Sequence, residues 1–85
     1  MLKRGSVVVS THGRDKNGIM AVWQVTPDSV WVVDGRRRPI SRPKRKNHRH
    51  VQPVGSDIGE SSMATNRELR RALTAVAENR ACKDT

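Results

Sequence analysis

The sequence predicts a small, mainly β domain followed by a C-terminal α-helix. Three observations support this class: the chain has only 85 residues, its large apolar residues are mostly valines, and short apolar runs alternate with Gly, Pro and Asn. Eighty-five residues can form one hydrophobic core but not two. Because valine is β-branched and fits a pleated, half-buried surface, a valine-rich core favours strands over helices.

Three apolar runs separated by short polar turns predict a meander of three strands. The turns contain Gly, Asn, Pro and Asp, which tolerate or preset the backbone angles of a chain reversal. In the second run the odd positions are apolar, so that strand is expected to be buried mostly on the face that carries them. The three strands are expected at residues 7–9, 19–25 and 30–33.

A segment bracketed by Pro39 and Pro43 follows the third run. Any strand there is expected to be short or at an edge, because proline has no backbone N–H to donate. A last apolar pattern, with Val51 and Val54, is expected to complete about five strands and to close a small barrel. The barrel is therefore expected to cover residues 1–54.

The last third of the chain predicts a linker, a helix and a flexible tail. Residues 55–64 are rich in Gly, Ser and acidic residues, as is typical of a linker. Thr65 and Glu68 fit a capping box, which predicts a helix over residues 65–79 and a flexible tail over 80–85. The apolar residues of this helix share one face, which must pack on the barrel or on a partner. They are Leu69, Ala72, Leu73, Val76 and Ala77.

The charge of the chain points to a polyanionic partner. Lys and Arg total 17 against 8 Asp and Glu, the formal net charge is +9, and the pI is near 11.4. Residues 1–54 hold 12 basic and 3 acidic residues, whereas residues 55–85 hold 5 of each. A field of this strength attracts nucleic acid before any specific contact forms. The barrel is therefore expected to carry the binding surface.

The main candidate site runs from Arg36 to His50, with 8 of the 17 basic residues and no acidic residue. Solvated surface runs usually alternate in sign, so this stretch is interpreted as a contact for RNA phosphates. A solvated loop or a contact for an acidic protein are the alternatives. The expected contact residues are Arg36, Arg37, Arg38, Arg42, Lys44, Arg45, Lys46, Asn47, His48, Arg49 and His50.

The turn after the first strand is a second candidate site, with Arg14, Lys16 and Asn17 as contact residues. Turn amides flanked by glycine can approach phosphates closely. The flanking Gly13 and Gly18 are equally consistent with a turn that only reverses the chain. We therefore expect the turn to be a secondary contact.

The two tryptophans are the only Phe, Trp or Tyr residues of the chain. Trp23 shares a predicted strand face with Ile19, Ala21 and Val25, so it is expected to belong to the core. Trp31 is open to two interpretations, a core residue or an exposed ring on which an unpaired base could stack.

Other functional classes have little support in the sequence. A thin core gives no walls for a deep cleft, so we expect no enzymatic activity, no cofactor and no small-molecule substrate. His48, His50 and Cys82 match no zinc-ligand spacing, so no metal is expected. The N-terminal apolar run is too short for a signal sequence or a membrane span, and a single cysteine fits a reducing compartment. The chain is therefore expected to be cytoplasmic, without membrane contact.

These features resemble a KOW motif. The chain is most similar to short bacterial KOW-domain RNA-binding proteins, which are related to a large-subunit ribosomal protein of eukaryotes and archaea. The resemblance covers residues 5–54 well and residues 65–73 more loosely. It is carried by a GRDKG-type turn, a V-x-D-G strand exit, a segment similar to RPKRKNHRHVQP and a helix similar to NRELRRAL.

The resemblance implies an SH3-like barrel followed by a helix, with ribosomal RNA, the ribosome and neighbouring ribosomal proteins as partners. The family usually has glycine directly after Asp-Lys, whereas here Asn17 stands there and Gly18 follows. Asn tolerates positive φ, so the turn is expected to persist. The resemblance also allows a protein-interaction module that docks through its barrel, since KOW barrels of transcription factors dock proteins. The apolar face of the helix allows docking through the helix. The charge also allows a DNA-binding architectural protein.

Overall fold

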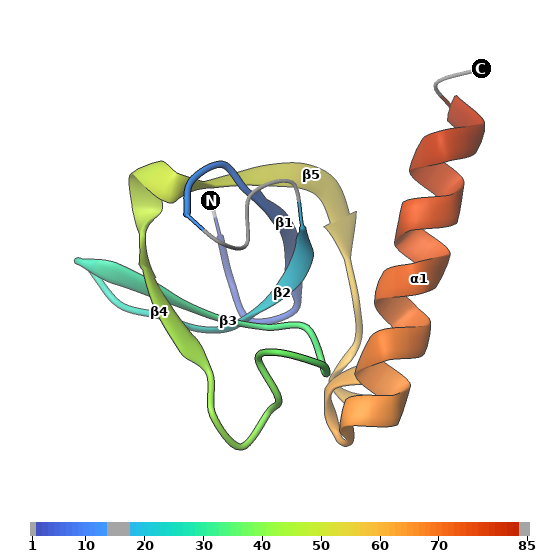
Figure 1. The fold of residues 1–85 in the computed structure, drawn as a ribbon, viewed down its shortest axis with the longest axis horizontal. Coiled ribbons are helices and arrows are strands. Elements are labelled where there is room, and N and C mark those ends of the chain that lie inside the picture. The colour runs from blue at the N-terminus through green and yellow to red at the C-terminus, as the bar shows by residue number, and fades with distance from the viewer. Residues whose placement is uncertain (1, 14–17, 84–85) are drawn as a thin grey trace.

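The computed structural model of the protein describes residues 2–13 and 18–83. Five strands, two 3-10 turns and one α-helix are present in the described chain. They are β1 (Ser6–Ser10), β2 (Ile19–Val25), β3 (Ser29–Val33), β4 (Lys44–Asn47), η1 (His48–His50), β5 (Val51–Asp57), η2 (Glu60–Met63) and α1 (Asn66–Lys83). The strands form one antiparallel sheet in the order β4-β3-β2-β1-β5, and α1 stands beside it (Figure 1). The predicted mainly β class with a C-terminal helix is confirmed.

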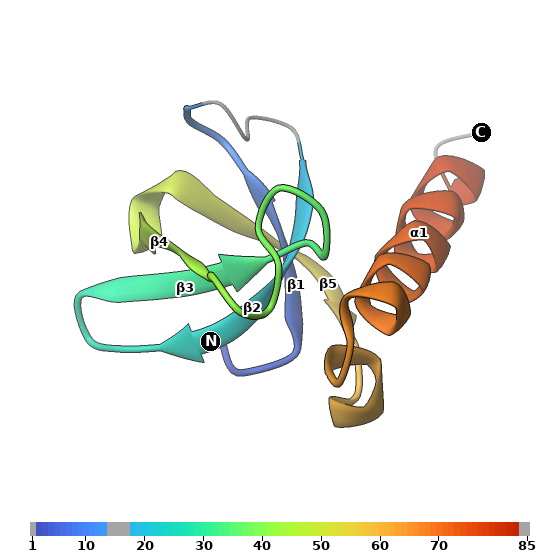
Figure 2. The same ribbon diagram turned by 60° about the horizontal axis from the view of Figure 1, so that its bottom comes forward.

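The sheet is strongly curved but open. β4 and β5 are its two edges, and no ladder joins them in the part of the chain that the structure describes. The two views of the ribbon show that the edges bend toward each other at η1, which connects them (Figures 1 and 2). Register shifts in the β1–β5 and β2–β3 ladders are consistent with this curvature, because a bulge increases local twist and bend.

Both faces of the sheet contribute to the hydrophobic core, which corrects the expectation that β2 is buried mostly on its odd positions. Met20 and Val22 are at most 1% exposed, whereas Ile19 is only half-buried. The reason is the curvature, because the inner face is enclosed by the sheet itself while α1 covers only part of the outer face. The inner cluster is Val8, Met20, Val22, Val30, Val32 and Val51. The outer cluster is Val7, Ala21, Val33, Met63, Leu69 and Leu73.

The segment after Val54 is more structured than its composition indicates. β5 continues to Asp57 instead of ending near Val54. Within residues 55–64, interpreted as a linker from the sequence, η2 places Met63 in the outer cluster at 2% exposure. This segment therefore packs on the sheet as well as connecting it to the helix.

α1 begins where the capping pattern predicts, because the Thr65 hydroxyl accepts the Glu68 backbone N–H at 3.1 Å. It continues to Lys83, whereas the sequence predicts an end near residue 79. Leu69 and Leu73 lie in the outer cluster and Val76 packs against it, so these residues of the apolar stripe pack on the sheet of their own chain, whereas Ala77 is exposed. No helix in the described residues has the length and apolarity to cross a bilayer.

Candidate nucleic-acid interface

The Asp34 side chain organises the first part of the basic stretch, the loop of residues 36–42 that we call the arginine loop. One Asp34 carboxylate oxygen accepts the backbone N–H groups of Arg36 at 2.8 Å and Arg38 at 2.9 Å. The backbone N–H groups of Asp34 and Gly35 in turn donate to the Arg38 carbonyl oxygen. The acid before the loop thus stabilises the loop backbone, while the side chains of Arg36 and Arg37 are exposed.

The first turns of α1 form hydrogen bonds with the arginine loop and with Gly35, the residue before it. The Asn66 side-chain oxygen accepts the Ile40 backbone N–H at 2.8 Å, and the Arg70 guanidinium donates to the Gly35 carbonyl oxygen at 2.8 Å. Gly35 is buried and has φ of +79°, a conformation that favours glycine. A Cβ on Gly35 would lie 2.7 Å from the Asn66 carbonyl oxygen and 2.9 Å from Arg70 Cγ. The helix can approach the loop this closely only because residue 35 has no side chain.

Gly35→Ala is therefore expected to lower the free energy of unfolding by roughly 2–4 kcal/mol, which combines left-handed backbone strain with steric overlap. Gly55→Ala is the matched control, because Gly55 has φ of +80° and nothing within 4 Å of the added Cβ. Gly55→Ala should lower the free energy of unfolding by only about 1–2 kcal/mol, because it adds backbone strain without steric overlap. Urea unfolding of both variants measures the difference, and equal losses would show that helix and loop are not in close contact.

The second part of the basic stretch forms β4, an edge strand whose side chains point alternately to the two faces of the sheet. Lys44 and Lys46 stand opposite Val32 and Val30 of β3, whereas Arg45 stands opposite Trp31. The Arg45 guanidinium Nε donates to the Ser29 hydroxyl at 2.6 Å, which fixes Arg45 along the edge. Alternation along a strand therefore divides this basic run between two faces.

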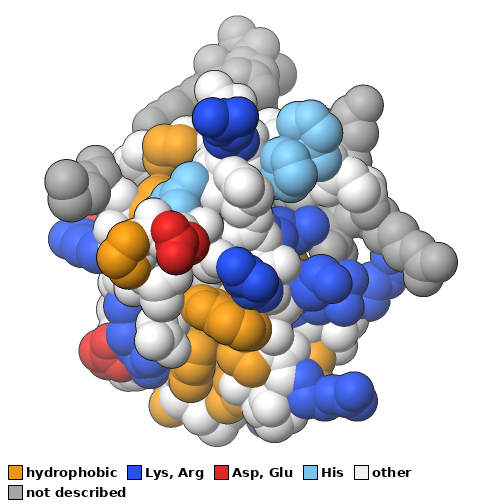
Figure 3. Space-filling model, turned by 90° about the vertical axis from the view of Figure 1, so that its left-hand side faces the viewer, with side chains coloured by type: hydrophobic (Ala, Val, Ile, Leu, Met, Phe, Trp, Pro, Cys, Tyr) orange, Lys and Arg blue, Asp and Glu red, His pale blue; other side chains and the backbone are white. Residues whose placement is uncertain are grey.

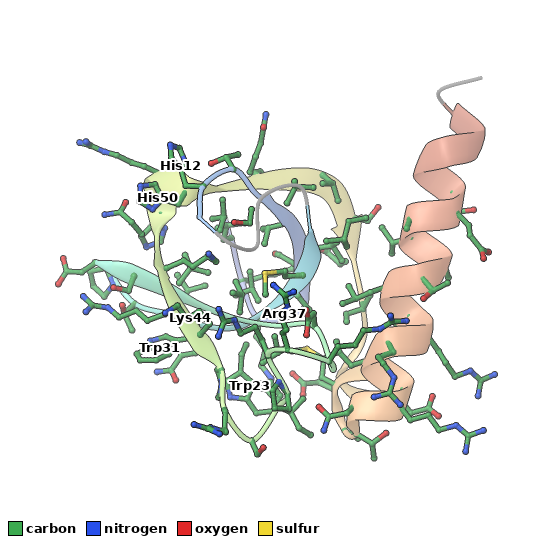
Figure 4. All side chains as sticks on the ribbon, viewed as in Figure 1. His12, Trp23, Trp31, Arg37, Lys44 and His50 are labelled. Atoms are coloured by element: carbon green, nitrogen blue, oxygen red, sulfur yellow. The ribbon has the colours of Figure 1, made fainter. Side chains whose placement is uncertain are left out.

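The three residues of η1 have different roles. His48 Nε2 lies 2.9 Å from the Thr26 carbonyl oxygen, so this side chain attaches η1 to the β2–β3 turn. Arg49 is exposed, and its backbone N–H donates to the Asn47 side-chain oxygen. The His50 ring stacks on His12, with 4.3 Å between ring centroids and 30° between planes. Figure 4 shows the two rings side by side at the η1 end of the sheet.

Most of these side chains line three grooves on the surface. The histidine groove, about 450 Å³, is lined by His12, Gly13, Asp28, Ser29, Lys44, Arg45, Lys46, Asn47 and His50. The arginine groove, about 490 Å³, is lined by Arg36, Arg37, Arg38, Pro39, Arg42, Pro43 and Lys44. The helix groove, about 480 Å³, is lined by Arg36, Arg67, Arg70, Arg71, Thr74, Ala75 and Glu78.

The three grooves are connected by shared basic residues. Lys44 lines both the histidine and the arginine groove, and Arg36 lines both the arginine and the helix groove. A continuous basic track therefore runs from the β4 edge over the arginine loop to α1. Figure 3 shows the face of the molecule at the η1 end of this track, with Lys, Arg and His side chains beside an apolar patch.

Among the described residues, several cations of the track have no acidic partner. The ion pairs found among the described residues join Lys3 to Asp57, Arg4 to Glu60 and Arg71 to Glu68. No acid in the described chain pairs with the side chains of Arg36, Arg37, Arg42 or Lys44, and none lines the arginine groove. These cations are available to an external anion.

The tryptophans lie on the outer side of the sheet (Figure 4). Trp23 is the additional residue where the β2–β3 register shifts. It is half-buried, contacts the outer cluster and carries the Arg4 guanidinium 4.1 Å above its ring, so the expected core role holds in part. Beyond the shift, Val25 packs against the inner cluster instead of sharing a face with Trp23. Trp31 is half-buried opposite Arg45 and belongs to neither cluster.

The structure brings together nine of the eleven residues expected in the main stretch and leaves two out. Arg49 and His48 line none of the three grooves. Arg14, Lys16 and Asn17 lie outside the described residues, although His12 and Gly13, which precede them in the chain, line the histidine groove.

The sequence interpretation missed the arginines of α1, Arg67, Arg70 and Arg71. Their spacing of i, i+3 and i+4 places them on one helix face, a signal hidden by the net neutrality of residues 55–85. It also missed His12, Asp28 and Ser29 as groove residues, because they lie beside the basic stretch only in the folded chain.

Among the described residues, no three His, Cys, Asp or Glu side chains are close enough to hold a metal ion together. A comparison of the chain with models of protein families found no match, and a comparison with curated proteins found none either.

Proposed function

We propose that this protein is a non-enzymatic RNA-binding protein that contacts phosphates along the basic track. The observation that carries the proposal is the continuity of three cation-lined grooves through Lys44 and Arg36. A chain of phosphates can contact such a track at several points without breaking its path. Phosphate contacts position a protein on nucleic acid but do not read its sequence, so shape is expected to dominate recognition.

The proposed target is ribosomal RNA, in the cytoplasm and in contact with the ribosome and its neighbouring proteins. Support for this target comes from the likeness of the sequence to KOW-domain proteins. As part of the same proposal, the curved five-stranded sheet corresponds to the SH3-like barrel of that family, with β4 and β5 as the strands that approach closure. Sedimentation of cell lysate through a sucrose gradient tests the target, because the protein should travel with ribosomal particles.

The alternative of a helix that docks a protein loses its main support, because Leu69 and Leu73 are 0% and 6% exposed in the chain's own core. DNA binding has the same charge signature as RNA binding. Competition between a ribosomal RNA fragment and duplex DNA of equal length at equal salt distinguishes them. We expect RNA to compete at least several times better, and equal competition would favour the DNA-binding alternative.

Binding is expected to depend steeply on salt. If about six phosphates contact the track, the slope of log K against log salt should be about −4.2 to −5.4, since each contact contributes about −0.7 to −0.9. Fluorescence anisotropy with a labelled ribosomal RNA hairpin between low and moderate salt measures this slope. A flat profile would contradict binding through the track.

A further inference from the structure

We propose that the histidine groove binds an unpaired nucleotide of the RNA, with the base stacked on the His12–His50 pair and a phosphate held by Lys44. The inference rests on the proposed function and specifies the RNA element that the protein selects. It follows from the composition of this groove. The polar side chains that line the arginine groove are all cationic, whereas the histidine groove also offers two imidazole rings, an amide and a carboxylate.

The two rings form a platform at the end of the sheet. His12 and His50 are both exposed and are stacked with 4.3 Å between centroids, and Thr11 Oγ1 lies 2.8 Å from His12 Nδ1. The next residue, Gly13, adds no side chain to the groove wall. Unpaired RNA bases stack on aromatic side chains that include histidine, whereas bases inside a duplex do not expose their faces.

The groove has the size and polar groups for a nucleotide. Its volume of about 450 Å³ falls within the range of about 300–1,000 Å³ typical of small-ligand sites. Lys44 lies at the junction with the arginine groove, where the phosphate path would continue. The Asn47 side-chain oxygen is occupied by the Arg49 N–H at 2.9 Å, so its amide nitrogen remains as a donor to a base edge.

The presence of Asp28 indicates that the histidine groove binds a base and not phosphate alone. Asp28 is the one acidic residue among the described residues that line the groove. A carboxylate repels phosphate but accepts N–H groups from the edge of a base. Guanine presents two neighbouring N–H donors, which match the two oxygens of a carboxylate. An acid at this position therefore favours a base, and guanine above the other bases.

The experiment compares two labelled RNA hairpins by fluorescence anisotropy at one salt concentration. One stem is fully paired, and the other is the same stem with one unpaired guanosine. The wild-type protein should bind the second roughly 5-fold to 150-fold more tightly, the range that stacking of one base provides. His12→Ala/His50→Ala should abolish this preference, so that the ratio of the two affinities falls to about one even if both affinities decrease. His12→Phe/His50→Phe should retain the preference, because phenylalanine still stacks.

Asp28→Ala gives opposite results for the two kinds of groove. If the groove holds a base, this variant binds the unpaired-guanosine hairpin several times more weakly and the paired stem no more weakly than wild type. If the groove holds phosphate alone, the loss of a repelling carboxylate strengthens binding of both hairpins, which would overturn the inference.

Equal binding of both hairpins by the wild-type protein, or a preference that persists in the double alanine variant, would also overturn it. Both outcomes leave the proposed function standing, because the paired stem is still bound with a steep salt dependence. If the wild-type protein binds neither hairpin, the proposed function itself is wrong.

Discussion

Replacing Arg37 and Lys44 together by glutamate is expected to weaken RNA binding by roughly a hundredfold or more at about 0.1 M salt. Both side chains are exposed, and Figure 4 shows them on the arginine loop and at the start of β4. Each is expected to make a charge-assisted contact worth about 1.5–3 kcal/mol, and the new carboxylates add repulsion. The slope of log K against log salt should become shallower by about 1.4–1.8, the contribution of two phosphates.

The matched control is Lys3→Glu/Arg49→Glu, which changes the net charge by the same amount. Lys3 and Arg49 are exposed and line none of the three grooves. This variant should lose less than about fivefold in affinity, since it reduces the long-range attraction and breaks only the exposed Lys3–Asp57 ion pair, which contributes little to stability. If both variants lose affinity equally, net charge and not the basic track determines binding. Anisotropy titrations at three salt concentrations provide the comparison, and circular dichroism verifies the fold.

Leu69→Ala is expected to lower the free energy of unfolding by about 2–5 kcal/mol, because it leaves a cavity between α1 and the sheet. Leu69 is fully buried, in contact with the same cluster as Val7, Ala21 and Val33. A domain of this size loses about 4–8 °C in melting temperature for each kcal/mol, so the change should exceed about 8 °C. Thermal unfolding followed by circular dichroism at 222 nm measures it.

Leu2→Ala is the control for this prediction, because it removes the same atoms from a half-buried residue at the margin of the inner cluster. Leu2→Ala should lower the free energy of unfolding by less than half as much as Leu69→Ala, because Leu2 buries less apolar area. If Leu69→Ala changes the melting temperature by no more than Leu2→Ala, α1 is not packed on the sheet in solution. The apolar stripe of the helix would then be free to dock a protein.

The strands were predictable because their signals are local. Runs of β-branched residues bounded by Gly, Pro and Asp specify β1, β2 and β3 within one or two residues. The helix start was predictable for the same reason, since the cap formed by Thr65 involves a residue only three positions away. The helix end was not, because the last turns of α1 carry no Gly or Pro to mark a stop.

β4 could not be predicted, because its sequence Lys44–Asn47 has no apolar residue and its strand conformation comes from pairing with β3. The same limit applies to burial of β2. Two covered faces require both the curvature of the sheet and the docking of α1, and neither leaves a periodic signal in a run of seven residues. Edge strands and doubly covered strands are therefore where tertiary contacts override local pattern.

The candidate site was predictable in composition but not in connectivity. A charge count identifies Arg36 to His50, but it does not show that the helix arginines continue the track or that His48 is used to attach η1. Contacts such as Arg70 to Gly35 join residues 35 positions apart. These contacts depend on the packing of α1, so the sequence of the basic stretch alone does not predict them.

The position of β4 at the edge of an open sheet has a consequence for self-association. An edge strand exposes unpaired backbone N–H and C=O groups, which can pair with a strand from another molecule and begin aggregation. Lysines on an edge prevent such pairing by repulsion, and β4 carries Lys44 and Lys46 beside Arg45. Neutralisation of these cations by RNA would remove the repulsion but cover the edge at the same time. The proposed ligand would thus take over the protective role of the charges that it neutralises.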